Sequence, residues 1–443
     1  MRVLALVDGE HYPPVTRWGL AAARTRGYEV AAALFLGGTE KIAAGTLPDL
    51  GVPVLPPVGS AEEALRDALA EVRPEAVLDL SDEPVLGNRE RMGLAAVALR
   101  HGIAYHGADF RLDPPISGPA LPVPALAVIG TGKRTGKTAV AGAVARVAAR
   151  RGADPVVVAM GRGGPAEPEV ARGGTVDLDR LLDLVRRGHH AASDYLEDAL
   201  FTGVTTVGAR RVGGGLAGAP FASNVRAAAD AAVAEGAGLV LLEGSGSSVP
   251  TVPWDAGILV APVDGLEESL GGYLGPLRVL LTDLVVATML AGPDLGPTHS
   301  VLRSHVQRLR PSARCVVIDF EPHPLGEVRG ASVFFTTTAP APIAERQAAG
   351  LAERHGCRVV GWSARLADRA GLVEDLEQAR EFDLLLTELK AAAVDVAAGA
   401  ALARGAGVIF VDNRPVSLPG EADLTTTLEE VVDLAVERGR SRT

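Results

Sequence analysis

The 443-residue sequence has two cysteines, few aromatic residues, only four lysines and no long hydrophobic run. Cys315 and Cys357 form no metal or redox motif, and two cysteines cannot build a disulfide framework, so a reducing, cytoplasmic location is expected. Aromatic residues make up 4% of the chain, so a core must be built from Ala, Val and Leu. No apolar segment reaches the roughly 20 residues that span a bilayer. The first residues are predicted to form a strand, not a signal peptide.

The charge balance narrows the class of protein further. The formal net charge is −11, 47% of the residues are apolar and 22% are charged, which excludes a disordered chain. An acidic total argues against a general binder of nucleic acid or of anionic membranes, but it leaves room for a local anion site. The sequence therefore predicts a folded protein with no nucleic-acid partner and no membrane partner.

Short apolar runs alternate with Ala-rich helical stretches, which is typical of parallel sheets covered by helices. In the first part, strands are expected at 2–7, 30–36, 76–80 and 103–105, and helices at 14–26 and 89–101. This pattern predicts a Rossmann-like domain over residues 1–112. Residues 113–124 contain five prolines and are predicted to be a linker, because proline removes backbone donors and restricts the preceding residue.

A second α/β unit is predicted over residues 125–313, and a third over residues 314–443. The strands of the second unit are expected at 125–130, 155–160, 239–244, 257–262 and 284–290. In the third unit, strands are expected at 315–320, 332–337, 357–362, 383–388 and 407–412, and helices at 342–355 and up to about 404. The sequence leaves open whether the third unit stands alone or extends the second sheet.

The most informative motif is GTGKRTGKT, which runs from Gly130 to Thr138 between a predicted strand and a predicted helix. Glycines let backbone N–H groups converge on phosphate oxygens, and a helix N-terminus adds partial positive charge. Lys137 is expected to reach the β- and γ-phosphates of ATP, and the Thr138 hydroxyl to hold Mg²⁺. The predicted nucleotide-binding residues are Gly130, Thr131, Gly132, Lys133, Arg134, Thr135, Gly136, Lys137 and Thr138. The spacing is imperfect, because Thr131 stands where the usual pattern has glycine.

This motif predicts that the second unit is a P-loop NTPase core with a parallel sheet. The predicted fold class is therefore α/β, with a Rossmann-like N-terminal unit, the P-loop core and a C-terminal α/β extension. There is no GxGxxG motif after the first strand, so dinucleotide binding is not expected there.

Glu243 is the second candidate magnesium ligand, in addition to Thr138. It lies in LLEGSGSS, residues 241–248, at the carboxyl end of a predicted parallel strand, where side chains point into the ligand crevice. Hard oxygen ligands suit Mg²⁺. The alternative is a turn after a core strand, with Glu243 merely solvated. Together with the form G-T-x-x-x-x-G-K-T, this segment resembles dethiobiotin synthetase and cobyrinic acid diamide synthase.

Candidate substrate contacts follow other predicted strands. Arg162, flanked by Gly163 and Gly164, leaves a strand end, and its guanidinium matches phosphate bidentately. It is a candidate catalytic residue together with Lys133 and Lys137, and a solvent-facing loop arginine is the alternative. If the segment 186–200 is helical, His190, Asp194 and Glu197 share one face and could contact substrate or metal. The further candidates are His190, Ser193 and Asp194 in this segment, and His11 and Arg89 in the first unit. A solvated helix face or a turn would also explain these residues.

The whole arrangement resembles the cyclic 2,3-diphosphoglycerate synthetase family. The resemblance rests on the N-terminal α/β unit, the Pro-rich linker, GTGKRTGKT, GRGGPAEPE, GHHAASDYLEDAL and LLEGSGSS. It covers nearly the full length, and the central motifs carry its specificity. It implies an ATP-dependent ligase that closes 2,3-diphosphoglycerate into an internal cyclic pyrophosphate and releases ADP and phosphate. It also implies Mg²⁺, a cytoplasmic location and a homodimer.

Two other functions fit a P-loop. One is another ATP-dependent ligase with a carboxylate or amide acceptor, although the GRGGP loop favours a phosphate-rich substrate. The other is a MinD-type ATPase switch. Those proteins carry K-G-G-x-x-K-[ST], whereas Gly132 stands five residues before Lys137 here, and the chain shows no basic amphipathic terminal helix.

Overall fold

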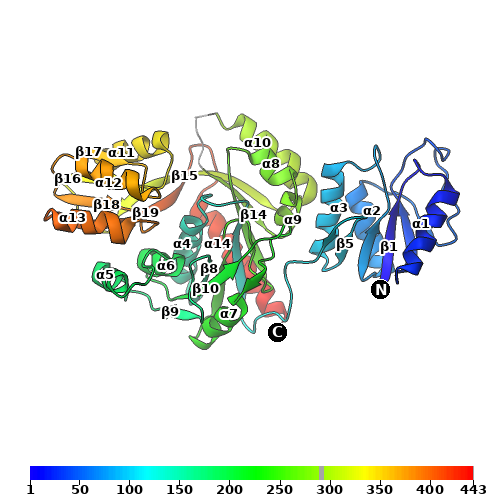
Figure 1. The fold of residues 1–443 in the computed structure, drawn as a ribbon, viewed down its shortest axis with the longest axis horizontal. Coiled ribbons are helices and arrows are strands. Elements are labelled where there is room, and N and C mark those ends of the chain that lie inside the picture. The colour runs from blue at the N-terminus through cyan, green and yellow to red at the C-terminus, as the bar shows by residue number, and fades with distance from the viewer. Residues whose placement is uncertain (289–293, 443) are drawn as a thin grey trace.

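Two β-sheets organise the chain in the computed structural model, which describes residues 1–288 and 294–442 (Figure 1). The first sheet has six strands in the order β3-β2-β1-β4-β5-β6. The second has thirteen strands and runs through the P-loop core into the C-terminal part of the chain. None of the described helices is both long enough and apolar enough to cross a bilayer.

The N-terminal sheet is parallel except at its last strand. Its strands are β1 (Arg2–Val7), β2 (Glu29–Phe35), β3 (Val54–Leu55), β4 (Ala76–Asp79), β5 (Ala104–His106) and β6 (Arg111–Leu112), and its helices are α1 (Pro13–Thr25), α2 (Ala61–Val72) and α3 (Asn88–Arg100). Helix α2 begins with a capping box, in which Ser60 and Glu63 each satisfy the other's backbone N–H. The Rossmann-like unit predicted from the sequence is confirmed.

The P-loop core places a parallel sheet in the order β10-β8-β12-β7-β13-β14. The strands are β7 (Ala125–Gly130), β8 (Pro155–Gly161), β10 (Thr206–Val212), β12 (Leu239–Glu243), β13 (Ala256–Pro262) and β14 (Leu284–Thr288), with β9 (Glu169–Ala171) and β11 (Ala222–Ser223) antiparallel to β10. The helices are α4 (Lys137–Arg150), α5 (Leu178–Arg186), α6 (Asp194–Thr202), α7 (Val225–Ala234), α8 (Leu266–Gly271), α9 (Gly275–Leu280) and α10 (Gly296–Leu302), which continues into a π-helical turn at Arg303–Gln307. Residues 289 and 290 of the strand predicted at 284–290 lie outside the described residues.

Two long strands join the third unit to this sheet. β15 (Arg314–Pro324) pairs in parallel with β14 through Val317, and its second half pairs antiparallel with β19 (Gly407–Ser417). The other elements of the unit are β16 (Ser332–Thr336), β17 (Arg358–Ser363), β18 (Leu384–Thr387), α11 (Ala341–His355), α12 (Arg369–Gln378), a π-helical turn at Ala393–Ala398 and α13 (Gly399–Ala403). The third unit therefore extends the second sheet. This answers the question that the sequence left open. The division of the chain after residues 112, 124 and 313 remains a prediction.

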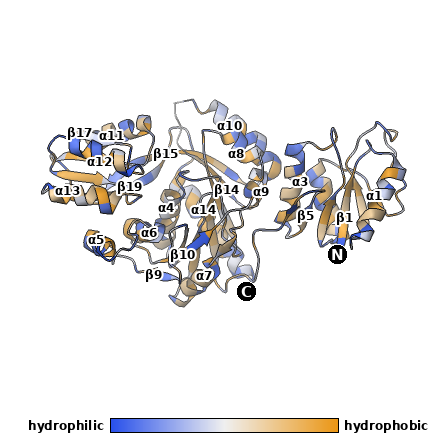
Figure 2. Ribbon diagram, in the orientation of Figure 1, coloured by the Kyte–Doolittle hydropathy of each residue, from blue (hydrophilic) through white to orange (hydrophobic). Residues whose placement is uncertain are grey.

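The last helix, α14 (Leu424–Arg442), returns to the P-loop core and packs against α4. Val140, Val144 and Val147 of α4 form the apolar face that their spacing predicts, and Leu428 and Val432 of α14 belong to the same core cluster. Small aliphatic residues dominate this core, and Figure 2 shows the strands of both sheets as mainly hydrophobic. Helix α14 thus supports the helix that starts at the P-loop.

The N-terminal unit contacts the P-loop core through helices. Helix α3 packs against α9, and exposed ion pairs surround this contact, with Arg89 2.9 Å from Glu267 and Arg308 2.6 Å from Glu62. Exposed ion pairs contribute little to stability, so apolar packing between the helices carries the contact.

We predict that Leu428→Ala lowers the free energy of unfolding by about 2–5 kcal/mol, because it leaves a cavity between α14 and α4. Urea unfolding followed by circular dichroism measures the loss. Leu402→Ala in α13 is the control, since Leu402 is exposed and its truncation should cost little. Equal losses in the two variants would contradict a supporting role for α14.

Candidate functional site

The loop between β7 and α4 forms the floor of the site. Gly136 has a φ of +88° and ends the loop immediately before α4. A Cβ atom on Gly130 would lie 2.7 Å from Cδ of Lys137, which is too close for any side chain. With the lysine side chain in this conformation, only glycine fits at residue 130 without a shift of that side chain.

Lys137 is almost completely buried beneath the loop. Its side chain folds back so that Nζ donates to the Gly132 carbonyl at 2.7 Å and lies 3.4 Å from Oγ1 of Thr135, and the residue is 7% exposed. Burial lowers the pKa of Lys137 to about 8, although Glu243 and Asp194 oppose that shift. The ammonium is thus held at the loop by neutral oxygens, which an incoming phosphate oxygen can replace.

Buried carboxyl groups stand beside the first turn of α4. Thr138 Oγ1 donates to Oε1 of Glu243 at 2.8 Å, and Glu243 is 3% exposed. Among the described residues, Oε2 of Glu243 and Oδ2 of Asp198 are buried without a hydrogen-bond partner. Burial raises the pKa of Asp198 well above its usual range, and neighbouring Glu243 raises it further. Two such carboxyl groups side by side favour a shared proton or a cation between them.

The oxygens of Thr138, Glu243 and Asp198 form a donor set of the kind that Mg²⁺ prefers. The described residues hold no group of three or more His, Cys, Asp or Glu side chains that could hold a metal ion. Magnesium usually keeps several waters and phosphate ligands and takes only one or two carboxylates from the protein, so the residues present fit this ion. Asp198 was not selected from the sequence. Its signal was available, since it stands four residues after Asp194 on what became α6.

A cavity of about 590 Å³ opens above the P-loop. Lys133, Arg134 and Arg162 line it, are exposed, and have no ion-pair partner in the described part of the chain. The structure thus brings together most of the predicted site residues. Those that line the cavity are Lys133, Arg134, Thr135, Gly136, Lys137, Thr138, Arg162, Gly163, Gly164, His190, Ser193, Asp194 and Glu243. Unpaired cations around a cavity in an acidic protein form a local anion site.

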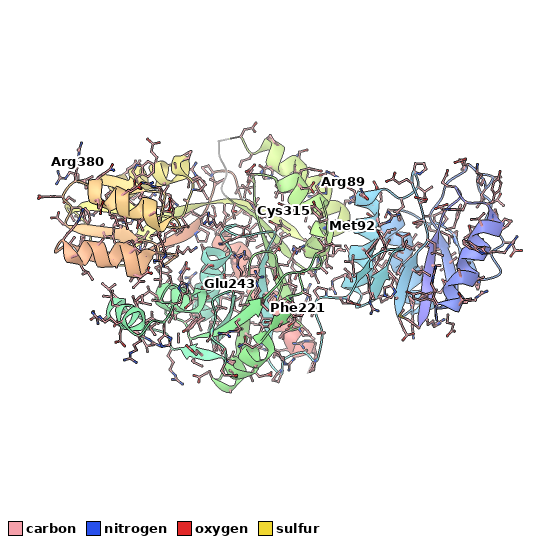
Figure 3. The ribbon with its side chains drawn as sticks, viewed as in Figure 1. Arg89, Met92, Phe221, Glu243, Cys315 and Arg380 are labelled. Carbon is pink, nitrogen blue, oxygen red and sulfur yellow. The ribbon has the colours of Figure 1, made fainter. Side chains whose placement is uncertain are left out.

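Five predicted residues do not line the cavity: Gly130, Thr131 and Gly132 at the start of the P-loop, and His11 and Arg89 in the N-terminal unit. His11 Nδ1 is 2.9 Å from Oδ1 of Asp8 in the N-terminal unit, and Arg89 pairs with Glu267 where that unit meets α8. Figure 3 labels Arg89 at this contact and Glu243 inside the P-loop core. Neither His11 nor Arg89 lines the cavity.

The segment 186–200 is not one helix. Helix α5 ends at Arg186 and α6 begins at Asp194, so His190 lies in the connecting loop and does not share a helix face with Asp194. Both residues still line the cavity. The loop places the His190 ring next to Gly163, where an added Cβ would lie 3.4 Å from Cδ2 of the imidazole.

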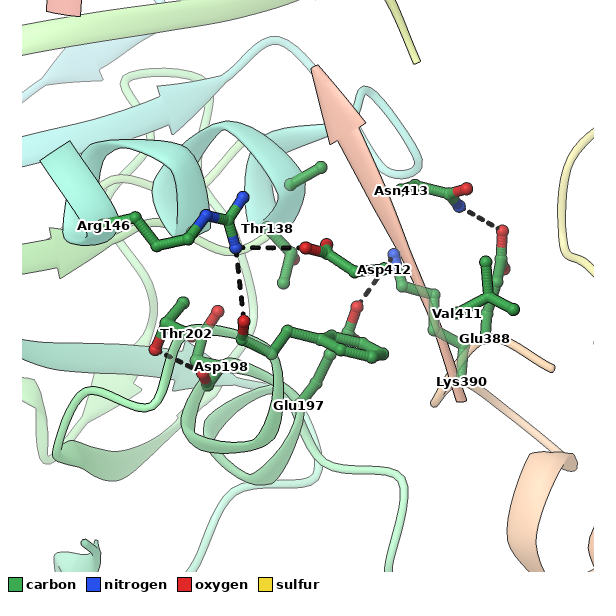
Figure 4. Close-up of a pocket in the computed structure, with 13 residues that line it drawn as sticks. Thr138, Arg146, Glu197, Asp198, Thr202, Glu388, Lys390, Val411, Asp412 and Asn413 are labelled. Carbon is green, nitrogen blue, oxygen red and sulfur yellow. Dashed lines mark hydrogen bonds and ion pairs between the residues drawn. The ribbon is translucent and has the colours of Figure 1, made fainter. Parts of the chain in front are cut away.

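The C-terminal unit supplies a wall of the cavity that sequence reasoning missed. Lys390 lies 3.4 Å from Oε1 of Glu197, and burial raises the pKa of Glu197 to about 8 while Lys390 opposes that shift. Glu388 accepts hydrogen bonds from Thr337, Thr338 and Asn413. Figure 4 shows Lys390 reaching Glu197 of α6, and Asn413 of β19 donating to Glu388. Lys390 is one of four lysines in the chain, which was the only available signal.

Comparison with known proteins identifies the family. Three family models match: "Cyclic 2,3-diphosphoglycerate synthetase, N-terminal domain" over residues 2–113, the corresponding "P-loop domain" over residues 125–317, and the corresponding "C-terminal domain" over residues 324–414. The chain belongs to the cyclic 2,3-diphosphoglycerate synthetase family. The resemblance that the motifs indicated is therefore confirmed, and the protein is an enzyme of the synthetase class with a nucleotide-binding P-loop.

Relatives named cyclic 2,3-diphosphoglycerate synthetase match over nearly the whole chain. The protein from Rubrobacter xylanophilus is 47% identical over 94% of this chain and 95% of its own length. Those from Thermococcus kodakarensis and Methanothermus fervidus are 42% and 37% identical, and cover 97% and 98% of this chain and 98% of their own lengths. A solved structure of LpxK from Aquifex aeolicus has a TM-score of 0.41 and 13% identity, covering 72% of this chain and 91% of that chain, and is too distant to bear on the site.

We predict that the affinity for nucleotide falls as the pH rises above about 8, approaching tenfold per pH unit. The reason is that Lys137, whose pKa burial lowers to about 8, loses its proton in the free enzyme. Titration of a fluorescent nucleotide analogue at several pH values measures this. Lys137→Arg should flatten the dependence.

Glu197 is the necessary control, because its pKa is also raised to about 8 and it gains negative charge over the same range. Glu197→Gln should leave the pH dependence in place. If the dependence disappeared in Glu197→Gln and persisted in Lys137→Arg, Glu197 and not Lys137 would be the group responsible.

Proposed function

We propose that the enzyme joins the two phosphates of 2,3-diphosphoglycerate into a cyclic phosphoanhydride, with conversion of ATP to ADP and phosphate. The observation that carries the proposal is the set of unpaired cations, Lys133, Arg134 and Arg162, around one cavity beside the P-loop. A substrate with two phosphates is rich enough in negative charge to satisfy them. The names of the full-length relatives support the same substrate.

The chemistry proceeds in two steps. One substrate phosphate attacks the γ-phosphorus of ATP, and ADP leaves. An oxygen of the neighbouring substrate phosphate then attacks the phosphorus of the substrate phosphate that accepted the γ-phosphoryl group. The transferred group leaves as inorganic phosphate, and the ring closes. Phosphate oxygens are already ionised near neutral pH, so no strong base is required. The second step is intramolecular, so holding the substrate in the right geometry supplies much of the rate.

The chain's own residues bring the polyanions together. Lys137 at the loop contacts the transferring phosphoryl group, and Lys133 and Arg134 approach from the exposed side of the loop. Arg162 holds the substrate phosphates through its guanidinium fork. Thr138, Glu243 and Asp198 would hold Mg²⁺, which neutralises charge between the β- and γ-phosphates when it is bound.

Other features of the proposal follow from family membership. We infer that the enzyme works in the cytoplasm as a homodimer, without a nucleic-acid or membrane partner. A ligase with a single carboxylate or amide acceptor is less well supported, since it would leave several of the cavity's cations without a partner. A MinD-type switch has no counterpart among the full-length relatives described above.

The decisive experiment mixes the purified protein with ATP, Mg²⁺ and 2,3-diphosphoglycerate and follows the reaction by phosphorus NMR. A new pair of pyrophosphate doublets that appears together with ADP is the expected result. ATP hydrolysis that is indifferent to the substrate would contradict the proposal and favour a switch. An acyl phosphate product would favour the carboxylate ligase.

We predict that Lys137→Ala reduces turnover by at least about a thousandfold while the protein remains folded, because no other buried cation among the described residues lies under the loop. Turnover is measured by ADP release and folding by circular dichroism. Lys41→Ala in the N-terminal unit is the matched control, since Lys41 pairs with Glu40 outside the cavity. A Lys137→Ala enzyme with a wild-type rate would remove the proposed active centre.

We predict that Arg162→Ala weakens use of 2,3-diphosphoglycerate by about 10–100-fold in kcat/KM, as expected for a lost charged hydrogen bond, and leaves the Kd for ATP nearly unchanged. Arg172→Ala is the control, because Arg172 pairs with Glu235 outside the cavity. Unchanged substrate kinetics in Arg162→Ala would contradict the clamp role.

A further inference from the structure

The cavity above the P-loop has two ends with different chemistry. At one end, Arg162 of the loop after β8, His190 of the loop before α6 and Asp194 of α6 present polar and charged groups. Toward β15 and α11, the lining is more apolar: it consists of Phe320, Ala339, Pro340 and Ile343, with Asp319, Thr338 and the amide of Gln347 among them. A ligand that fills both ends needs a highly charged part and a largely apolar part.

The order of the strands indicates which end of the cavity the phosphates of a nucleotide would occupy. β7, which leads into the P-loop, lies between β12 on one side and β13, β14 and β15 on the other. Glu243, the partner of Thr138, ends β12, so the terminal phosphate of a nucleotide points toward that side. The rest of the nucleotide must then extend toward β15. Phe320 of β15 lies against the loop, since a Cβ on Gly136 would be 2.3 Å from Cζ of its ring.

Gln347 is a buried amide without a partner for its oxygen. It lies on α11 and is 6% exposed, and its Oε1 makes no hydrogen bond to any described residue. Buried amide oxygens are almost always hydrogen-bonded, so an orphaned one that borders a cavity indicates a donor supplied by a ligand. Arg346, the residue before Gln347, pairs with Asp319 at 3.0 Å, which fixes α11 to β15 next to Phe320.

We propose that this end of the cavity is the subsite for the nucleotide base, and that Oε1 of Gln347 accepts a hydrogen bond from the 6-amino group of adenine. Phe320 and Ile343 provide the apolar surface for the flat base. The proposal rests on the proposed use of ATP and adds the residue that sets base specificity. With the amide oriented so that Oε1 faces the base, a 6-oxo purine would place a second acceptor against it, and both oxygens would then be unsatisfied.

The inference gives the C-terminal unit a function. Gln347 and Ile343 both belong to α11 of that unit, whereas the phosphate-binding residues belong to the P-loop core. The nucleotide would therefore contact both parts of the chain at once. The junction of β15 and β19 sets the distance between the two contacts.

A binding series on the wild-type protein tests the proposal directly. Displacement of a fluorescent nucleotide by ATP, inosine triphosphate and purine riboside triphosphate, each with Mg²⁺, compares an amino group, an oxygen and a hydrogen at position 6. ATP should bind at least about tenfold more tightly than either of the others, the effect of one hydrogen bond. Equal affinities for the three would overturn the proposal.

Substitutions assign the effect to a residue. Gln347→Met keeps the size of the side chain and removes the acceptor, so the three affinities should converge to within about threefold. Gln378→Met, at an exposed site in the same unit, should keep the wild-type preference. Phe320→Leu should weaken all three nucleotides by the same factor, because stacking does not depend on the group at position 6. Unaltered preference in Gln347→Met would overturn the assignment.

The binding series also separates this proposal from the proposed reaction. Preferential binding of ATP without conversion of 2,3-diphosphoglycerate would contradict the reaction and still support the base subsite. Cyclisation that proceeds equally well with inosine triphosphate would support the reaction and overturn the base subsite. If Gln347→Met failed to fold, the wild-type series would still decide.

Discussion

The hydrogen bond from Thr138 to Glu243 is the interaction on which the site depends. It ties the first turn of α4 to the end of β12, and the parallel register of β12 with β7, which sets Glu243 beside Val128, determines where it forms. Because the two strands are neighbours, the loop after one and the carboxylate at the end of the other meet at the same edge of the sheet. Asp198 reaches the same point from α6. Three elements distant in sequence thus converge on one group of oxygens.

The acidic and basic side chains around this group of oxygens lie at different depths in the cavity. Carboxyl groups lie at the bottom, where burial raises the pKa values of Glu197, Asp198 and Glu243, and the free cations lie at the rim. Some buried charges are matched, since Lys390 stands beside Glu197. The partnerless oxygens of Asp198 and Glu243 are the exception. Two buried carboxylates side by side repel each other, and a proton or a cation between them removes that repulsion. The free enzyme therefore favours binding of a positively charged ligand at this point.

Sequence reasoning succeeded where the chemistry is local. The P-loop could be predicted because strand, loop and helix are consecutive, and Glu243 could be predicted because a strand end specifies a direction as well as a position. It missed Asp198, Lys390 and Gln347, whose roles depend on contacts between distant parts of the chain. The segment 186–200 shows a further limit, because Gly188 interrupts it and local periodicity could not reveal that His190 leaves the helix. The long strands β15 and β19 were predicted too short, since their second halves pair with each other and not with a parallel sheet.

The way in which the C-terminal unit is attached explains how one site can draw on two units. The chain leaves the P-loop sheet along β15, folds the unit, returns along β19 and then covers α4 with α14. The unit is therefore held at both ends by elements of the core. Arg146 of α4 also pairs with Asp412 of β19 at 3.1 Å in a largely buried position. This ion pair would lose much of its stabilising effect if α4 and β19 shifted relative to each other, because each charge would then be buried without its partner. This geometry argues that the wall carrying Lys390 and Gln347 is positioned by the same helix that carries Lys137, so the contacts to phosphate and to the far end of the nucleotide share one rigid frame.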